Sequence, residues 1–254
     1  MLRTRVLSAA ALLAIVAAPA FLGGLPFFAL IALIGALAVW EYARLLHQEN
    51  GAVILPLAIP LALLFIGQAQ WADNFPIELA LTLAVLSSLI GSLWRKSAKP
   101  VNDWALTLAG ALYLGWLLGL WIRLRSAENG LEWLLLAACP VWAADVAAYF
   151  AGRAFGRHPF WPRHSPKKTW EGYLAGIAGA VLVAGLIGAW LLQIGLLESM
   201  ALGLLIGAIA PLGDLAESMI KRQAGAKDSS HLIPGHGGVL DRIDSLLIAA
   251  PLVY

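Results

Sequence analysis

A succession of apolar stretches, each close to the length needed to cross a bilayer, runs through almost the whole chain. A transmembrane helix needs about 20 mostly apolar residues, because each residue adds about 1.5 Å and the hydrocarbon core is about 30 Å thick. Eight stretches approach this length, the second and the eighth being short: 6–22, 26–40, 53–70, 76–94, 104–122, 131–151, 172–192 and 198–213. Residues 245–254 are apolar but too few to cross. We therefore expect an all-α, polytopic integral membrane protein with about eight to nine transmembrane helices.

Composition supports the bilayer as the solvent. Of the 254 residues, 61% are hydrophobic and 13% are charged, whereas a soluble domain is about 45–50% apolar and about 25% charged. The single cysteine, Cys139, excludes a disulfide framework and a paired-cysteine metal site. Arg3 and Arg5 before the first apolar stretch resemble the start of a signal peptide, but further apolar stretches follow at once, which favours a retained helix.

The basic residues predict an orientation. If the N-terminus is cytoplasmic, 15 of the 17 Lys and Arg residues fall in cytoplasmic segments, and only Arg123 and Arg125 fall on the opposite side. This asymmetry also places two long polar loops, 152–171 and 214–244, on the cytoplasmic side. Residues 1–130 are apolar helices that indicate no chemistry. We expect residues 131–254 to form the catalytic transmembrane region, with its site at the cytoplasmic interface.

The densest polar segment follows the eighth apolar stretch and should continue its helix. Asp214, Glu217, Ser218 and Lys221 have the spacing of one helical face. Carboxylates at the end of a membrane helix are costly unless they meet a metal, a cation or water. A solvated face with ion pairs between successive turns is the alternative interpretation.

A glycine-rich loop, 223–240, comes next. Glycine lets backbone N–H groups approach phosphate oxygens closely. The flanking cations suit a polyphosphate, and the flanking aspartates are hard oxygen ligands that suit Mg²⁺. These groups are Lys221, Arg222, Lys227 and Arg242, and Asp214, Asp241 and Asp244. Such interleaving of acids and bases indicates a nucleotide bound with a divalent metal, and His236 in the glycine turn is expected to touch phosphate.

Another polar group surrounds the loop 152–171. Asp145 lies about 9 Å inside the sixth apolar stretch, at 1.5 Å per residue, where an ionisable group indicates function or a pair with another helix. Lys167 and Lys168 should lie at the start of the seventh helix, with Ser165 or Thr169 as its cap. The helix dipole disfavours cations there, so an anionic ligand or a role as a positive-inside anchor is the reason for them.

These motifs together resemble one known family. The residues that match run from Ser218 through Lys221-Arg222, Lys227-Asp228 and the Pro-Gly-His-Gly-Gly segment 234–238 to Asp241-Arg242-x-Asp244. This run resembles the signature of the phosphatidate cytidylyltransferases, or CDP-diacylglycerol synthases. Segments 145–156, 165–172 and 213–218 are also similar to that family. Family members usually end with a full spanning helix, for which residues 245–254 are too few.

The resemblance implies that CTP and phosphatidate give CDP-diacylglycerol and pyrophosphate at a bacterial-type inner membrane. It implies Mg²⁺ held by Asp214 and Asp241, with two divalent ions, or a divalent and a monovalent ion, as alternatives. The implied catalytic residues are Asp214, Lys221, Asp241, Arg242 and Asp244. The implied substrate-binding residues are Asp145, Lys167, Lys168, Ser218, Arg222, Lys227, Asp228, His236, Gly237 and Gly238.

The implied partners are CTP, phosphatidate and the bilayer, without nucleic acid. The small residues Gly172, Gly176 and Ala180 allow close helix packing, either within one chain or in a homodimer. Two other functions remain open. A CTP-dependent polyprenol kinase would share the nucleotide and the metal, with Asp145 as a base. A transporter would need polar residues along several stretches, whereas here they collect at one end.

Overall fold

The computed structural model describes residues 14–47, 52–163 and 165–254 and divides the chain into two compact units. Unit 1 comprises Met1–Ser126 and Gln223–Arg242, and unit 2 comprises Ala127–Arg222 and Ile243–Tyr254. The glycine-rich loop therefore packs with the first half of the chain rather than with the helix that precedes it. The predicted functional division near residue 130 stays a prediction.

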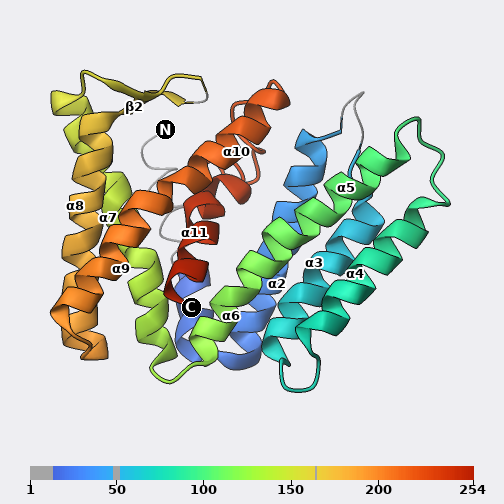
Figure 1. Cartoon of the computed structure of the whole chain (residues 1–254), viewed down its shortest axis with the longest axis horizontal. Helices are drawn as coiled ribbons and strands as arrows, with labels where there is room; N and C mark the ends of the chain where they lie inside the picture. The colour runs from blue at the N-terminus through green and yellow to red at the C-terminus, as the bar shows by residue number, and fades with distance from the viewer. Residues whose placement is uncertain (1–13, 48–51, 164) are drawn as a thin grey trace. The chain divides into compact units, whose positions relative to one another are not determined.

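Unit 1 is built from helices that pack around small side chains. Its helices are α2 (Gly24–Leu45), α3 (Leu55–Gln70), α4 (Ile77–Ser92), α5 (Pro100–Gly110), the π-helix η1 (Ala111–Trp116) and α6 (Leu117–Ser126) (Figure 1). A buried cluster of Leu61, Phe65, Ala80, Ala84 and Ala111 joins α3 and α4 to η1. Small residues at these positions bring the helix backbones close together.

Unit 2 contains α7 (Gly130–Phe155), α8 (Trp170–Ile187), the π-helix η2 (Gly188–Leu192), α9 (Leu196–Ile209) and α10 (Pro211–Gln223), and α11 (Leu240–Val253) enters it from unit 1. The helices α7, α8 and α9 pack side by side (Figure 1). A Cβ atom at Gly172 or Gly176 would lie within 3.0 Å of a carbonyl oxygen of α7. These two glycines are therefore used for packing inside the chain, and a homodimer stays a prediction.

A small antiparallel sheet of β1 (Pro159–Trp161) and β2 (Ser165–Thr169) departs from the expected all-α fold. Prolines at 159, 162 and 166 prevent a helix there, because proline lacks the N–H that an interior turn requires. Lys167 and Lys168 lie in β2, so their expected position at the start of a helix was wrong. Thr169 caps α8 as expected, since its Oγ1 accepts a hydrogen bond of 3.2 Å from the N–H of Gly172.

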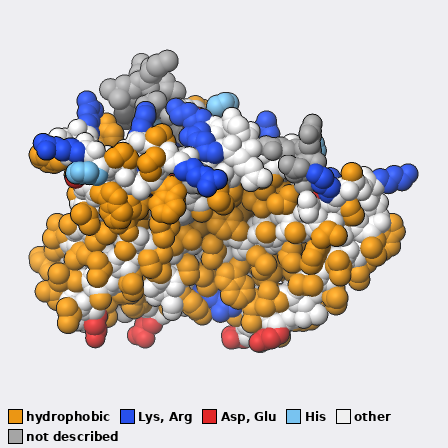
Figure 2. All heavy atoms as spheres, turned by 45° about the horizontal axis from the view of Figure 1, so that its top comes forward, with side chains coloured by type: hydrophobic (Ala, Val, Ile, Leu, Met, Phe, Trp, Pro, Cys, Tyr) orange, Lys and Arg blue, Asp and Glu red, His pale blue; other side chains and the backbone are white. Residues whose placement is uncertain are grey.

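The helices fit a membrane protein. Five helices in the described part of the chain are long and apolar enough to span: Gly24–Leu45, Pro100–Ser126, Gly130–Phe155, Trp170–Leu192 and Leu196–Gln223. Leu55–Gln70 and Ile77–Ser92 are shorter apolar helices. Residues 6–13 of the first predicted stretch, 6–22, lie outside the described residues, and the total of eight to nine spans stays a prediction. Hydrophobic side chains cover most of the face drawn in Figure 2, as expected of a surface in contact with lipid.

Candidate active site

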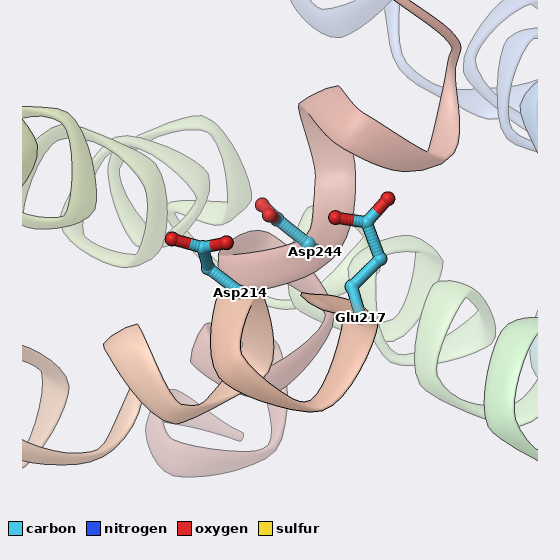
Figure 3. A group of neighbouring side chains, drawn as sticks. All are labelled: Asp214, Glu217 and Asp244. Carbon is cyan, nitrogen blue, oxygen red and sulfur yellow. The ribbon is translucent and has the colours of Figure 1, made fainter. Parts of the chain in front are cut away.

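Three carboxylates of unit 2 converge. Asp214 and Glu217 lie one turn apart on α10, and Asp244 comes from α11 (Figure 3). Each offers an oxygen atom within 4.8 Å of the others. Gly213 allows this approach, because a Cβ atom there would collide with the backbone carbonyl of Asp244. We call these three side chains the carboxylate cluster.

Burial and negative charge both act on the cluster. Glu217 is fully buried, and Asp214 and Asp244 are partly exposed. Burial raises the pKa of Asp244 to about 7, and the charges of Asp214 and Asp145 act in the same direction. The charge of Lys221 opposes the rise in the pKa of Asp244. This electrostatic link between Asp145 and the cluster was not predicted from the sequence, and the assignment of Asp145 to substrate binding stays a prediction.

Two lysines and one hydroxyl contact the cluster. Nζ of Lys221 lies 2.6 Å from Oε2 of Glu217, and Nζ of Lys168 lies 2.7 Å from Oδ2 of Asp214. The hydroxyl of Ser218 donates to Oδ1 of Asp214 at 3.2 Å. The side chains of Glu217 and Lys221 are 0% and 10% exposed. Glu217, Ser218 and Lys221 on the predicted face of α10 are therefore buried rather than solvated. The ion pair between successive turns that belonged to the alternative interpretation is present, between Lys221 and Glu217.

The carboxylate cluster fits a divalent cation by its chemistry. Carboxylate oxygens are the hard ligands that Mg²⁺ prefers, and three of them on two helices provide a negatively charged cage. The cluster includes Glu217, which the sequence-based assignment of ligands omitted although it lies on the same predicted face as Asp214. Its place directly after an apolar helix was the signal that could have identified it.

An acidic residue outside the motifs organises the glycine-rich loop in unit 1. Glu41 on α2 is fully buried. Its Oε1 accepts hydrogen bonds from the hydroxyl of Ser230 (2.6 Å) and the N–H of Val239 (2.9 Å). Its Oε2 accepts from the hydroxyl of Ser229 (2.9 Å) and the N–H of Leu240 (2.7 Å). Sequence reasoning missed Glu41, although an acid at the end of an apolar stretch is a signal in itself.

Asp241 is held by the same loop. Its Oδ2 accepts from the N–H and the hydroxyl of Ser229, both at 2.9 Å, and from the N–H of Gly238 at 2.8 Å. Gly237 has φ 82° and its carbonyl accepts from the N–H of Ile233 at 2.9 Å, which closes a tight turn. A Cβ atom on Gly237 would lie 2.6 Å from Oδ2 of Asp241. The loop thus fixes the carboxylate of Asp241, whose role as a metal ligand stays a prediction.

A hollow of about 550 Å³ opens beside this loop in unit 1. Its walls come from the end of α2 and from the loop: Trp40, Arg44, Leu45, His47, Ala224, Ala226, Asp228, Ser229, Ser230, His231 and Leu232. The guanidinium of Arg44 lies 4.8 Å from the ring centre of Trp40. Asp228 is the only predicted substrate-binding residue among these lining residues.

The remaining predicted phosphate-binding side chains have different degrees of exposure. Lys167, Arg222, Lys227 and Arg242 are exposed, and His236 is partly buried in the glycine turn. Exposed cations are accessible to a soluble polyanion, so their positions are compatible with the predicted role. Contact with a phosphate stays a prediction for each of them.

Comparisons with known proteins agree across almost the whole chain. The model of the cytidylyltransferase family matches residues 3–254. The chain is 37% identical over 284 residues to a phosphatidate cytidylyltransferase of Synechocystis sp., covering 98% of this chain and 94% of that protein. It is 36% identical over 260 residues to the Pseudomonas aeruginosa protein of the same name, covering 99% and 95%. The Bacillus subtilis protein of that name is 34% identical over 241 residues, covering 91% and 88%.

Proposed function

This chain belongs to the cytidylyltransferase family, and we propose that it transfers the cytidylyl group of CTP to phosphatidate in an Mg²⁺-dependent reaction that releases pyrophosphate. It is a nucleotidyltransferase of phospholipid synthesis. One observation supports the choice of substrates. The three relatives described above are each matched over most of their length, and each is named phosphatidate cytidylyltransferase.

The proposed cytidylyl transfer requires that the substrates be positioned, and it does not require a general base. A phosphate monoester has its second pKa near 6, so the attacking oxygen of phosphatidate is largely ionised at neutral pH. That oxygen forms a bond to the α-phosphorus of CTP, and the bond from this phosphorus to the β-phosphate breaks. The electron pair leaves with pyrophosphate, so the site must align three phosphates and neutralise their charge.

The carboxylate cluster suits the metal that this reaction requires. Asp214, Glu217 and Asp244 would hold Mg²⁺ through oxygen atoms that already lie within 4.8 Å of one another. When bound, the ion would neutralise charge on phosphate oxygens and on the leaving pyrophosphate. Lys221 orients Glu217 through their 2.6 Å ion pair, and Lys168 orients Asp214 through a 2.7 Å ion pair. Either lysine can turn from its carboxylate to a phosphate oxygen when the substrates arrive.

The location of the substrates supports a site at the cytoplasmic face of the inner membrane. CTP is dissolved in the cytoplasm, and phosphatidate stays in the leaflet. The side chains proposed to act therefore need access both to water and to lipid. The long basic loops, which the distribution of Lys and Arg assigns to the cytoplasm, carry Lys168 and most of the other predicted phosphate-binding residues.

Isotope transfer tests the proposal directly. Purified protein would be given phosphatidate, Mg²⁺ and CTP labelled at the α-phosphorus, and then γ-labelled CTP with a polyprenol. We expect α-label in the lipid only when phosphatidate is present, with one pyrophosphate released for each lipid formed and no reaction in a chelator. Label from the γ-phosphate in the polyprenol would instead identify the kinase, and absence of label in lipid from either position would contradict both enzymes.

A further inference from the structure

Glu41 lies far from the glycine-rich loop in the sequence but joins two parts of that loop in space. It is fully buried on α2, and its four hydrogen-bond donors come from two sites in the chain, Ser229-Ser230 and Val239-Leu240. We propose that Glu41 is a positioning residue that fixes the glycine-rich loop and through it the orientation of Asp241. The proposal rests on the cytidylyl transfer proposed above, for which Asp241 is a predicted catalytic residue.

The donor pattern requires a carboxylate. Each oxygen of Glu41 accepts one bond from a hydroxyl and one from a backbone N–H. The four donors match the four lone-pair positions of an ionised carboxylate. A glutamine would place an NH₂ group against the N–H of Val239 or of Leu240, and a backbone donor cannot reverse its direction. The substitution would therefore remove one backbone hydrogen bond and place two donors, the NH₂ group and the backbone N–H, against each other.

Two of these donors belong to the start of α11. The first N–H groups of a helix have no partner within the helix, so they need an acceptor from elsewhere. Glu41 supplies it for Val239 and Leu240 from another helix of unit 1. Its negative charge also suits the positive end of the helix dipole. The start of α11, and with it Asp241 in the first turn, is thereby tied to α2.

Ser229 links Glu41 to Asp241. Its hydroxyl oxygen lies 2.9 Å from Oε2 of Glu41 and 2.9 Å from Oδ2 of Asp241. The single hydroxyl proton of Ser229 is shared between these two carboxylate oxygens, and the N–H of Ser229 donates to Asp241. Gly238 is enclosed in the same network, because a Cβ atom there would collide with Ser229 and Glu41. A movement of Glu41 must therefore move the residues that hold Asp241.

The main test compares Glu41→Gln with Glu41→Asp in the cytidylyl-transfer assay. We expect Glu41→Gln to lower kcat/KM for CTP about 10–100-fold, the usual loss when a residue that orients a ligand is removed. Glu41→Asp keeps the charge and should recover a large part of that loss. The matched control is Glu78→Gln, an identical change at an exposed side chain of unit 1. Equal kinetics of Glu41→Gln and wild type, or no recovery with aspartate, would overturn the proposal.

A second variant and a measurement that does not depend on catalysis distinguish the proposed positioning role from misfolding of the variant. Ser230→Ala removes one donor and should lower kcat/KM by a smaller factor, about 3–10-fold. Its loss should be less than additive with that of Glu41→Gln, because both act on one network. Amide hydrogen exchange should be faster at 229–240 in both variants and unchanged in α7 and α8. Additive losses of kcat/KM, with hydrogen exchange in both variants equal to that of the wild type, would contradict the network. If the wild-type protein shows no cytidylyl transfer but exchange at 229–240 is faster in the variants, only the proposed function is contradicted.

Discussion

Lys168 on β2 and Asp214 on α10 form an ion pair of 2.7 Å, and Nζ of Lys168 also donates to the carbonyl oxygen of Pro211 at 3.4 Å. The neighbouring Lys167 is exposed on the same strand. The sequence assigned both lysines to substrate binding on equal terms. The structure distinguishes them, because only Lys168 reaches the carboxylate cluster through a described contact.

Replacing each lysine by methionine should therefore give unequal losses. Lys168→Met removes the cation beside Asp214, and we expect its kcat/KM to fall about tenfold further than that of Lys167→Met, in line with losses for residues that orient ligands. Steady-state kinetics with phosphatidate and CTP varied in turn provide the measurement. If the two variants lose activity equally, the ion pair between Lys168 and Asp214 does not contribute to activity.

The carboxylate cluster makes a prediction about metal dependence. Asp244→Asn keeps the volume of the side chain but removes a charged ligand, so activity should fall about 100-fold or more and half-maximal activity should need more Mg²⁺. Asp73→Asn, the same change at an exposed residue, is the control. An unchanged Mg²⁺ requirement in Asp244→Asn would exclude Asp244 from the metal site.

The pKa of Asp244 predicts how pH affects stability. Burial and the charges of Asp214 and Asp145 raise this pKa from 3.8 to about 7. The folded protein therefore favours the protonated carboxyl, and the associated stability is present at low pH and is lost as pH rises through 7. Mg²⁺ favours the ionised carboxylate, so it should raise the melting temperature more at pH 8 than at pH 6. Asp244→Asn should abolish that difference, and an equal Mg²⁺ effect at both pH values in the wild type would refute the prediction.

Two glycines in the same loop provide a matched pair. Gly237 and Gly225 have φ of 82° and 64°, so alanine at either position carries a similar strain of about 1–2 kcal/mol. A Cβ atom at 237 would meet Oδ2 of Asp241, whereas at 225 no atom lies within 4 Å. We expect Gly237→Ala to lose at least about ten times more activity than Gly225→Ala, as for other displaced catalytic groups. Similar losses would mean that backbone strain alone matters.

Cysteine labelling tests the orientation predicted from the basic residues. In a Cys139→Ala background, a cysteine at the exposed Ala127 should react with an impermeant maleimide in intact cells. A cysteine at the exposed Ala98 should react only after permeabilisation, because the positive-inside rule places its loop in the cytoplasm. Labelling of position 98 in intact cells would reverse the proposed topology.

Much of the site on α10 follows from sequence periodicity. The spacing of Asp214, Glu217, Ser218 and Lys221 predicted one helical face, and the last three of these residues are buried on α10 (Pro211–Gln223). The glycine turn before Asp241 could also be predicted from the sequence, since glycine is one of few residues that adopt positive φ without strain. The sheet of β1 and β2 was not predicted, because a segment rich in proline is typical of an irregular loop.

What the sequence by itself determined were features set by neighbouring residues: apolar helices of membrane-spanning length, the acidic and basic face of α10, the cap at Thr169 and the tight turn at Gly237. The tertiary structure alone decided which distant groups meet. Glu41 contacts residues 188 to 199 positions away, and Lys168 reaches Asp214 from a different element. Helical periodicity states which side chains share a face but not which helix covers that face. That choice depends on how small residues let the helices pack, and the folded backbone is what brings the carboxylates and their cations together.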